Sequence, residues 1–600
     1  MDGCLARPAS GGAVDRSPVL DALFAMMPVM TTPAGALTPP GRLVAGAVSG
    51  AVAGVLVAVP AAAAEQGWLS WTVHAVVLGA ILGLLTGAHR QSLGSSFAVG
   101  VLAGLLDWAG WQLTAVPLLA GTIPRWSSGD AAATFDDLIR ATLLGAVAGI
   151  VLFRATALLR RRSRTAETAP RRPHIVVVGG GFGGLGAGRR LDALLARGLR
   201  AEVTVISESN FLLFTPLLVG VASSALEARH VSAPVRAALR HATFLHGRVE
   251  SVDTTARTLE VAAGNRGRRQ VPYDALILAV GGVAHFFDLP GVAEHAFAMK
   301  SIDDANRLRD HVLAALEQAD REPDAVEQQR LLTFVVAGGG FAGTELIAEL
   351  YDLVHDVLHY YPRLHDLSPR FMLAHSGDRL LPELPAELGD YARYTLARRG
   401  IEFRLGVRVT GADAGSVRLS DDGVVATGTL AWTAGNRPNP LLGSIVAGRT
   451  GPLAVDEYLR VPELDGVWAI GDCARIPDTG DPGAFHPPTA QHAIREGKVV
   501  ADNVAAAITG GRPRPFRFGG LGVLVSLGHR RAAGLVWGRP VSGLAGWVLW
   551  RAVYLSKLPG TEKRLRVLAD WLLDLGFPRD IALTSSGTAT VPATTKDHHV

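Results

Sequence analysis

The stretch HIVVVGGGFGGLGAGRRL, residues 174–191, decides the fold of most of this chain. A short apolar run is followed by glycines in GxGxxG spacing and then by a helical pattern. Gly179 suits the tight turn, Gly181 lets the backbone approach a pyrophosphate, and Gly184 allows close packing of helix and strand. The helix N-terminus then favours the phosphate charge. The stretch therefore predicts a Rossmann-like domain that binds a dinucleotide.

The same arrangement occurs a second time. After the first fingerprint, the apolar run Ala201–Ile206 ends beside Glu208, which is predicted to accept hydrogen bonds from the adenosine ribose hydroxyls. The run Leu331–Ala337 leads into a second fingerprint, formed by Gly338, Gly340 and Gly343. Two fingerprints predict two dinucleotides, one per domain, and the obvious pair is a flavin and a nicotinamide nucleotide.

Two later segments predict that the second domain interrupts the first. Tyr273–Val280 is an apolar strand ending in glycines, and Gly466–Ile470 leads into Gly471 and Asp472. An acid after a glycine at a strand end can hydrogen-bond a ribityl hydroxyl. The expected FAD-binding domain is discontinuous, with one segment at 172–325 and another at 429–512, and it encloses an NAD(P)H-binding domain at 326–428. A C-terminal membrane-anchoring or dimerisation region at 513–585 and a disordered tail at 586–600 are expected to follow.

Residues 1–165 predict an all-α membrane domain with four transmembrane helices. The four apolar stretches are Leu43–Ala64, Trp68–Ala88, Phe97–Ala120 and Leu138–Leu159. Each is long enough to cross a hydrocarbon core of ~30 Å. Gly145 and Gly149, four residues apart in the last stretch, predict close helix–helix packing. The arginines after the fourth stretch place the catalytic domains of this multi-pass protein on the cytoplasmic side of the cell (inner) membrane.

Composition excludes several classes of protein. Apolar residues make up 48% of the chain and charged residues only 19%, which agrees with a membrane component. The net charge of +4 comes without a dense basic stripe, so no nucleic-acid partner is expected. The two cysteines, Cys4 and Cys473, cannot build an iron–sulfur cluster or a Cys4 zinc site, and no metal site is predicted. Redox chemistry is therefore expected from an organic cofactor.

Several stretches after residue 172 resemble the two-dinucleotide flavoproteins, and within them the type II (non-proton-pumping) NADH:quinone oxidoreductases. The stretches are NFLLFTPLL at 210, VVAGGGFAGTELIAEL at 335, LAWTAGNRPNPLL at 430, GVWAIGDCA at 466 and PPTAQHAIREGKVVADN at 487. The combination of FTPLL with TAQ is far more specific than either glycine fingerprint. The likeness covers roughly residues 172–583, and the four apolar stretches lie outside it.

This resemblance implies a role for each matching residue. The first fingerprint, Gly471 and Asp472 would hold FAD, while Thr215 and Pro216 would lie against the isoalloxazine ring. The second fingerprint would hold the nicotinamide nucleotide. Further positions that match the family are Glu345, a carboxylate near the flavin, Gln491, the first glutamine of an AQxxxQ motif at the quinone pocket, and Gly435, in a cofactor-binding stretch.

Two positions depart from the family pattern. Arg495 stands where the motif has its second glutamine. Arg495 is therefore a candidate quinone contact, but through a guanidinium group in place of an amide. His375 stands where the acid that reads the adenosine ribose usually ends the strand. Without that acid a 2′-phosphate is not repelled, so the electron donor is expected to be NADH or NADPH.

The C-terminal region predicts a membrane contact. The segments Gly546–Leu558 and Arg564–Leu575 show an aromatic-rich face with basic flanks, suited to the headgroup layer. A dimer interface or a covering helix is the alternative for these segments, and a homodimer is a compatible expectation.

The expected reaction is ping-pong hydride transfer from NAD(P)H to FAD, followed by electron transfer to a lipid quinone. A sulfide:quinone oxidoreductase needs paired cysteines beside the flavin, where only Cys473 stands. Another reductase of the pyridine nucleotide-disulfide type would explain neither TAQ nor the C-terminal segments. A transporter or sensor with a redox-reporting flavin domain would require several paired polar residues in the spans, where the sequence shows essentially Asp107.

Overall fold

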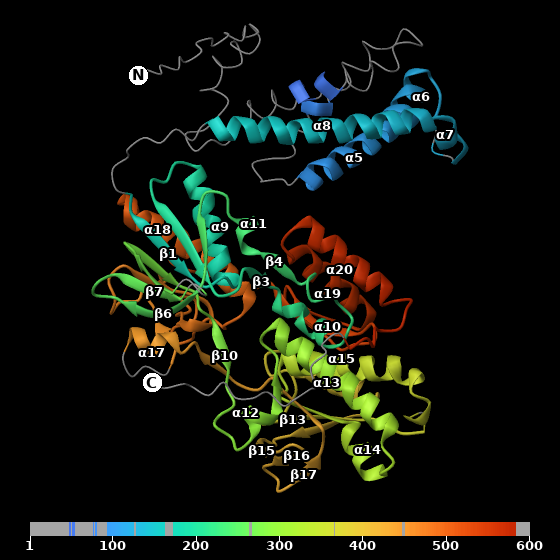
Figure 1. Cartoon of the computed structure of the whole chain (residues 1–600), viewed down its shortest axis with the longest axis vertical. Helices are drawn as coiled ribbons and strands as arrows, with labels where there is room; N and C mark the ends of the chain where they lie inside the picture. The colour runs from blue at the N-terminus through green and yellow to red at the C-terminus, as the bar shows by residue number, and fades with distance from the viewer. Residues whose placement is uncertain are drawn as a thin grey trace, which may run out of the picture. The chain divides into compact units, whose positions relative to one another are not determined.

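The computed structural model describes residues 47–49, 51–53, 76, 78–80, 93–124, 126, 128–162, 172–262, 264, 267–364, 366–446 and 451–583. The chain divides into two units, and each is described by itself. The first comprises residues 1–172 and 192–200, and the second comprises residues 173–191 and 201–600. Figure 1 shows the elements of both units.

The described residues of the first unit form mainly a pair of long antiparallel helices. The first helix consists of α5 (Leu93–Gly110), a π-helical turn (Trp111–Ala115) and α6 (Val116–Leu119), and it is followed by the short α7 (Ser128–Ala133) and then by α8 (Phe135–Arg162). The two long helices approach so closely that a Cβ added at Gly145 or Gly149 would collide with backbone carbonyl oxygens of α5. The close packing predicted for these glycines is thereby confirmed.

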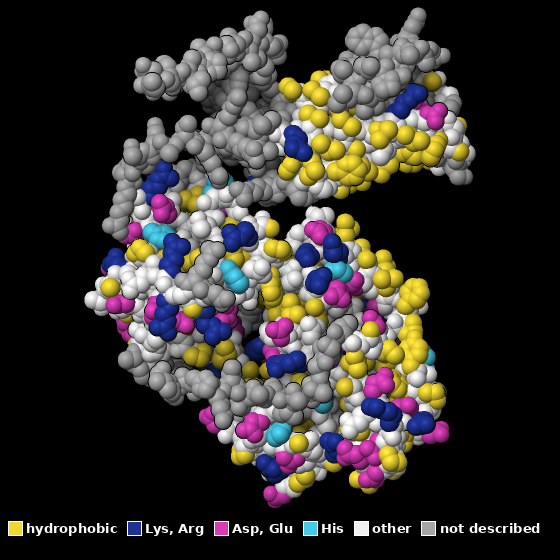
Figure 2. Space-filling view, viewed as in Figure 1, with side chains coloured by type: hydrophobic (Ala, Val, Ile, Leu, Met, Phe, Trp, Pro, Cys, Tyr) yellow, Lys and Arg dark blue, Asp and Glu magenta, His cyan; other side chains and the backbone are white. Residues whose placement is uncertain are grey.

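Apolar side chains cover much of the outer surface of this helix pair. The large exposed ones include Phe97, Leu102, Leu106, Leu118 and Leu143, and Figure 2 shows yellow side chains spread along the pair. Among the described residues, Ser96–Leu118 is the one helical stretch long and apolar enough to cross a membrane. The expected spans at 43–64 and 68–88 lie almost wholly outside the described residues.

The second unit begins with a five-stranded parallel sheet, here called the first sheet. Its strand order is β21–β9–β1–β2–β5, with bounds Val467–Ala469, Ala275–Leu278, His174–Val178, Glu202–Ser207 and Thr243–His246. Four of the five residues of β1 are buried, as expected for a strand with neighbours on both edges. Helix α9 (Phe182–Ala196) follows β1. Strand β21 pairs with β9 although almost 200 residues separate them, so the chain returns to the first sheet after a long excursion.

A second five-stranded parallel sheet has the order β11–β18–β12–β13–β14. Its strands are Ala296–Ala298, Thr429–Trp432, Thr333–Ala337, Arg370–His375 and Ile401–Leu405, and the helices α13 (Ile302–Arg321) and α15 (Phe341–Val357) belong to the same region of the chain. This sheet corrects the expected boundaries of 326–428. Both β11 and β18 lie outside that range, and β18 pairs in parallel with β11 and β12. The sequence pattern did not reveal β11 because a strand of three residues carries almost no periodic signal.

Smaller elements connect and extend the two sheets. A two-stranded antiparallel ribbon, β10 (Gly282–Ala284) with β19 (Asn436–Pro438), lies at the crossings between the two domains. Two antiparallel sheets branch off, β6–β7–β8 (Arg248–Asp253, Thr258–Ala262 and Arg268–Pro272) and β15–β16–β17 (Val409–Ala412, Ser416–Leu419 and Val424–Ala426). Helix α18 (Ala490–Thr509) follows the first sheet's last strand, β21.

The C-terminal region comprises an antiparallel sheet and two helices. The sheet is β23–β24–β25 (Gly522–Ser526, Ala532–Val536 and Arg539–Ser542), and the helices are α19 (Gly543–Lys557) and α20 (Thr561–Leu573). Trp550 on α19 and Trp571 on α20 belong to the same apolar core as α13 and α15.

The outer face of α19 and α20 differs from the expected one. Trp550 and Trp571 are 9% and 4% exposed, so the tryptophans point inward. The aromatic face that was expected to meet the headgroup layer is therefore largely buried, because it packs on the core of the NAD(P)H-type domain. The large exposed apolar residues of these two helices are all aliphatic and comprise Leu544, Val548, Leu565, Leu568, Leu572 and Leu573.

Candidate functional site

Both glycine fingerprints form the turn that a dinucleotide requires. Gly179 has φ +112° and Gly338 has φ +117°, a region that side chains rarely adopt. A Cβ added at Gly184 would collide with the carbonyl oxygen of Gly179, and one at Gly343 would collide with that of Gly338. Each fingerprint thus brings a helix N-terminus close to the end of the strand that precedes it, where an anionic pyrophosphate is favoured.

The first fingerprint also leaves room for a ligand. A Cβ at Gly181 would meet nothing within 4 Å, so this stretch of backbone is open to a bound group. Glu208 lies just past the end of β2, exposed, with Arg248 Nε 2.9 Å from its carboxylate. This position suits the predicted contact with an adenosine ribose, provided that the carboxylate is shared with Arg248.

Asp472 lies where the first sheet's last strand ends. Its carboxylate accepts a 3.0 Å hydrogen bond from Asn436 Nδ2, and burial raises its pKa above the usual range. The preceding turn is held by Glu496 of α18, whose carboxylate accepts a 2.8 Å bond from Gly471 N. Burial raises the pKa of Glu496 to about 7. Sequence reasoning missed Glu496, although it lies next to the noted Arg495.

Glu345 lies in the first turns of α15 and is almost completely enclosed. Its Oε1 accepts hydrogen bonds from Ser526 N at 2.8 Å and from Trp550 Nε1 at 3.2 Å. Burial outweighs these two bonds and raises the pKa of Glu345 to about 8. Burial therefore favours the protonated form of this carboxyl group at neutral pH.

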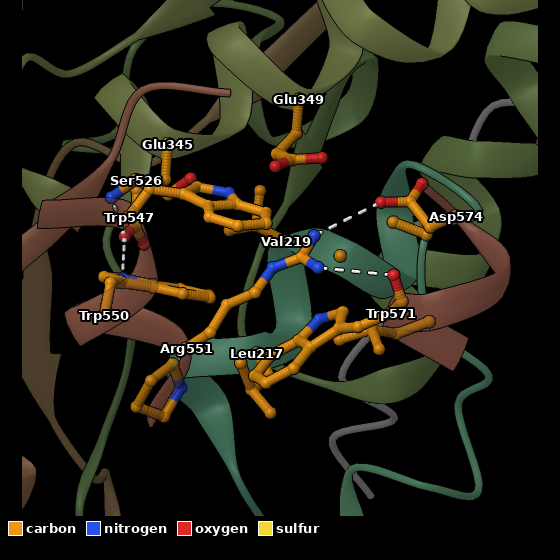
Figure 3. Close-up of a pocket in the computed structure, with 14 residues that line it drawn as sticks. Leu217, Val219, Glu345, Glu349, Ser526, Trp547, Trp550, Arg551, Trp571 and Asp574 are labelled. Carbon is orange, nitrogen blue, oxygen red and sulfur yellow. Dashed lines mark hydrogen bonds and ion pairs between the residues drawn. The ribbon is translucent and has the colours of Figure 1, made fainter. Parts of the chain in front are cut away.

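Glu345 lines a pocket with both apolar and charged walls, which is shown in Figure 3. Pro216 and Leu217 of the FTPLL stretch form one side of the wall, and the C-terminal helices form another. The predicted contact residues Thr215 and Pro216 both lie on a short 3₁₀ turn, Thr215–Leu217. The structure thus brings Glu345 and Pro216, which are far apart in the sequence, to a single pocket. The remaining charged lining residues are Glu349, Arg551 and Asp574.

Gln491 and Arg495 lie one turn apart at the start of α18, beside β23. The Gln491 amide donates a 2.7 Å bond to Gly522 O. The Arg495 guanidinium donates to Gln491 O at 2.9 Å and stacks 3.9 Å from the ring centre of Phe518. Neither residue lines the pocket of Glu345. The expectation that both border a quinone site stays a prediction.

His375 ends β13 and packs against the second fingerprint, since a Cβ at Gly339 would collide with its ring. Arg379, four residues further along the chain, donates to the carbonyl oxygens of Leu384 and Pro382. The carboxylate of Glu383, which sequence reasoning missed, would lie 3.2 Å from a Cβ at Gly340. Gly435, predicted to contact a cofactor, follows β18 with φ +85°.

The remaining residues that sequence reasoning missed are the charged groups around Glu345. They are Glu349, Arg551, Asp574 and Arg579, and they come from α15, α19, the end of α20 and the following segment. A spacing of four residues between Glu345 and Glu349 was a usable signal. The partners on other elements carry no local signal. Cys473 is buried and is free, and burial raises the pKa of its thiol to about 11, so it lacks the environment of a reactive cysteine.

Comparison with known families agrees with this geometry. Residues 173–497 match the family model described as pyridine nucleotide-disulphide oxidoreductase, and residues 521–580 match that of the NDH2 C-terminal domain. The chain is 31% identical to a type II NADH:quinone oxidoreductase of Mycobacterium tuberculosis, over 67% of this chain and 88% of that protein. It is 27% identical to an external alternative NADH-ubiquinone oxidoreductase of mitochondria from Yarrowia lipolytica, over 74% of this chain and 87% of that protein.

Solved structures show the same fold. NDH2 from Plasmodium falciparum, in complex with NADH, superposes with a TM-score of 0.63 at 21% identity, covering 69% of this chain and 100% of that one. The sulfide:quinone oxidoreductase of Aquifex aeolicus superposes with a TM-score of 0.52 at 17% identity, covering 68% of this chain and 96% of that one.

Proposed function

Because this chain belongs to the type II NADH:quinone oxidoreductase family, we propose that it takes hydride from NADH onto FAD and passes the electrons to a lipid quinone. The observation that carries the proposal is the pocket in which Glu345 meets Pro216 and the C-terminal helices. It joins the second dinucleotide fold, the FTPLL stretch and the family's C-terminal region around one carboxyl group that holds a proton at neutral pH.

The residues present fit the two nucleotides. The open backbone at Gly181 and the enclosed turn at Gly184 suit a pyrophosphate at the first fingerprint, and Asp472 suits a ribityl hydroxyl. Gly338 and Gly343 form the same enclosed turn for the nicotinamide nucleotide, while the Glu383 carboxylate lies beside Gly340. When bound, FAD supplies the redox chemistry, and the protein contributes orientation and electrostatics. Thr215, Pro216 and Gly435 would then contact the cofactors.

Glu345, Gln491 and Arg495 are the groups proposed to serve the quinone. Glu345 holds a proton that a reduced quinone needs. Gln491 and Arg495 offer an amide and a guanidinium at the edge of β23, the strand that also binds Glu345 at its other end. Both are hydrogen-bond donors of the kind that a quinone oxygen accepts.

The protein is further proposed to act at the inner membrane, with its catalytic domains on the cytoplasmic side. The exposed aliphatic residues of α19 and α20 would lie in the interfacial layer, and the four N-terminal apolar stretches would span the bilayer. The arginines that follow the fourth stretch support this orientation. A homodimer through the C-terminal region is compatible with this arrangement.

Purified protein tests the proposal directly. It should be yellow and should release FAD on denaturation, and NADH should bleach its flavin under anaerobic conditions. Addition of a ubiquinone or menaquinone analogue should then restore the oxidised spectrum. Recovery of FMN alone, or a flavin that NADH reduces but no quinone reoxidises, would contradict the proposed function.

A further inference from the structure

One face of α15 carries an acidic row that continues beyond Glu345. Its members are Glu345, Glu349, Asp352 and Asp356, at spacings of four, three and four residues, which places them on one side of the helix. The row begins at the enclosed end, where Glu345 is 8% exposed, and it ends at Asp356, whose side chain is 50% exposed. Of this row, Glu345 and Glu349 line the pocket, whereas Asp356 lies at the exposed end of the helix and does not.

Arg579 binds the middle of this row. Its guanidinium donates to Glu349 Oε2 at 2.9 Å and lies 3.4 Å from both Asp356 Oδ2 and Asp574 Oδ1. Arg551 lies 3.4 Å from the other oxygen of Asp574. The side chain of Arg579 is 6% exposed, so these contacts are largely shielded from solvent.

The cluster has more acids than bases. It contains five carboxyl groups, from the acidic row and Asp574, against three guanidinium groups, from Arg399, Arg551 and Arg579. Unpaired charges are costly inside a protein, so some of this excess is held as protonated carboxyl groups. Burial raises the pKa of both Glu345 and Asp574, in agreement with this count.

Three of these carboxyl groups line one pocket. Glu345, Glu349 and Asp574 all face it, and Figure 3 shows Arg551 reaching across it toward Asp574. Glu345 is enclosed on its other sides by Ser526 of β23 and by Trp550 and Tyr554 of α19. The pocket is therefore the route by which a proton can reach Glu345 from the remaining acids.

We propose that Glu349 and Asp574 deliver protons from solvent through this pocket to Glu345. This inference rests on the proposed function, in which NADH, one proton and quinone become NAD⁺ and quinol. Hydride carries two electrons and one proton equivalent, whereas the quinone oxygens gain two electrons and two protons, so solvent must supply one proton per turnover. Glu345 loses its O–H proton toward the reacting quinone, and Glu349 or Asp574 returns a proton to it.

The substitutions Glu349→Gln and Asp574→Asn test the route. Each should slow reoxidation of the reduced enzyme by quinone about tenfold or more, while anaerobic flavin reduction by NADH stays within about twofold. Glu349→Asp should recover most of the rate. A small weak acid such as formate, added to Glu349→Gln, should restore it as well, because a diffusing acid can replace a lost proton donor but cannot repair a structural defect.

Asp356→Asn is the matched control. Asp356 lies at the same 3.4 Å from Arg579 as Asp574 does, but it does not line the pocket. It should leave the quinone step unchanged. If Asp356→Asn slows this step as much as Asp574→Asn does, the effect comes from positioning of Arg579 and the proposal is overturned.

Proton uptake gives a second readout of the quinone step. When quinone reoxidises the reduced enzyme in weakly buffered solution, a pH indicator should report slower uptake in both pocket variants, but not in Asp356→Asn. Unchanged uptake in Glu349→Gln and Asp574→Asn would overturn the proton route. Failure of the unsubstituted protein to reduce any quinone would instead contradict the proposed function itself.

Discussion

Replacing Glu345 with glutamine should change how the stability of this protein depends on pH. Burial raises the pKa of Glu345 from 4.5 to about 8 in the folded chain. Between these two values the folded chain holds a proton that the unfolded chain has released. The free energy of unfolding therefore falls as the pH rises through this window, and the loss is complete above about pH 8. Within the window, the free energy of unfolding falls by ~1.4 kcal/mol for each pH unit.

The Glu345→Gln variant removes this slope and keeps the local contacts. Its amide oxygen can accept the same bonds from Ser526 N and Trp550 Nε1. Between about pH 5.5 and about pH 7.5, the unsubstituted protein should lose about 2.7 kcal/mol that the variant retains. For a cooperative unit of 150–250 residues this corresponds to a change of roughly 5–11 °C in the difference between the two Tm values.

Thermal unfolding of both proteins across this pH range measures the effect. Other carboxyl groups with a raised pKa, such as Glu496, are present in both proteins and largely cancel in the difference. The exposed Glu387 provides a control, and Glu387→Gln should shift Tm by the same small amount at every pH. A Tm difference between Glu345→Gln and the unsubstituted protein that does not grow with pH would refute the reasoning.

Three further predictions concern turnover and location. Gln491→Ala should slow quinone reduction about tenfold in stopped-flow assays while flavin reduction by NADH stays nearly intact; loss of both steps would contradict the assignment. The kcat/KM values for NADH and NADPH should agree within about tenfold, and His375→Glu should favour NADH; a preference above about a thousandfold in the unsubstituted protein would place discrimination at Asp378 or Glu383. Deletion of residues 1–165 should leave a yellow protein that sediments with vesicles, and a wholly soluble product would refute the C-terminal membrane contact.

The elements that the sequence predicted well are those with a local signal. The turns at Gly179 and Gly338 require positive φ, and Gly184 and Gly343 meet backbone at close range, so the pattern of glycines alone locates both strand–turn–helix units. The return of the chain to the first sheet at β21 was also predictable, because its apolar run ends in the same kind of glycine turn.

The outer face of the C-terminal helices was harder to predict for a physical reason. A helix with apolar residues around most of its circumference does not reveal which side faces the core. On α19 the tryptophan that was expected outside, Trp550, donates to Glu345, a residue more than 200 positions earlier. Only the tertiary contact with α15 shows that this ring lies inward and that aliphatic side chains such as Leu544 and Val548 lie outward.

The charge state of Glu345 shows most clearly why the site could not be read from the sequence alone. Near the N-terminus of a helix, an acid is normally favoured in its charged form by about 0.3–1 kcal/mol. That local effect predicts a lowered pKa. The C-terminal region encloses the same carboxyl group with Ser526 and Trp550, and the resulting burial is worth about 5 kcal/mol in the opposite direction. Burial wins by a wide margin, so enclosure by β23 and α19 raises the pKa of this helix acid above neutrality.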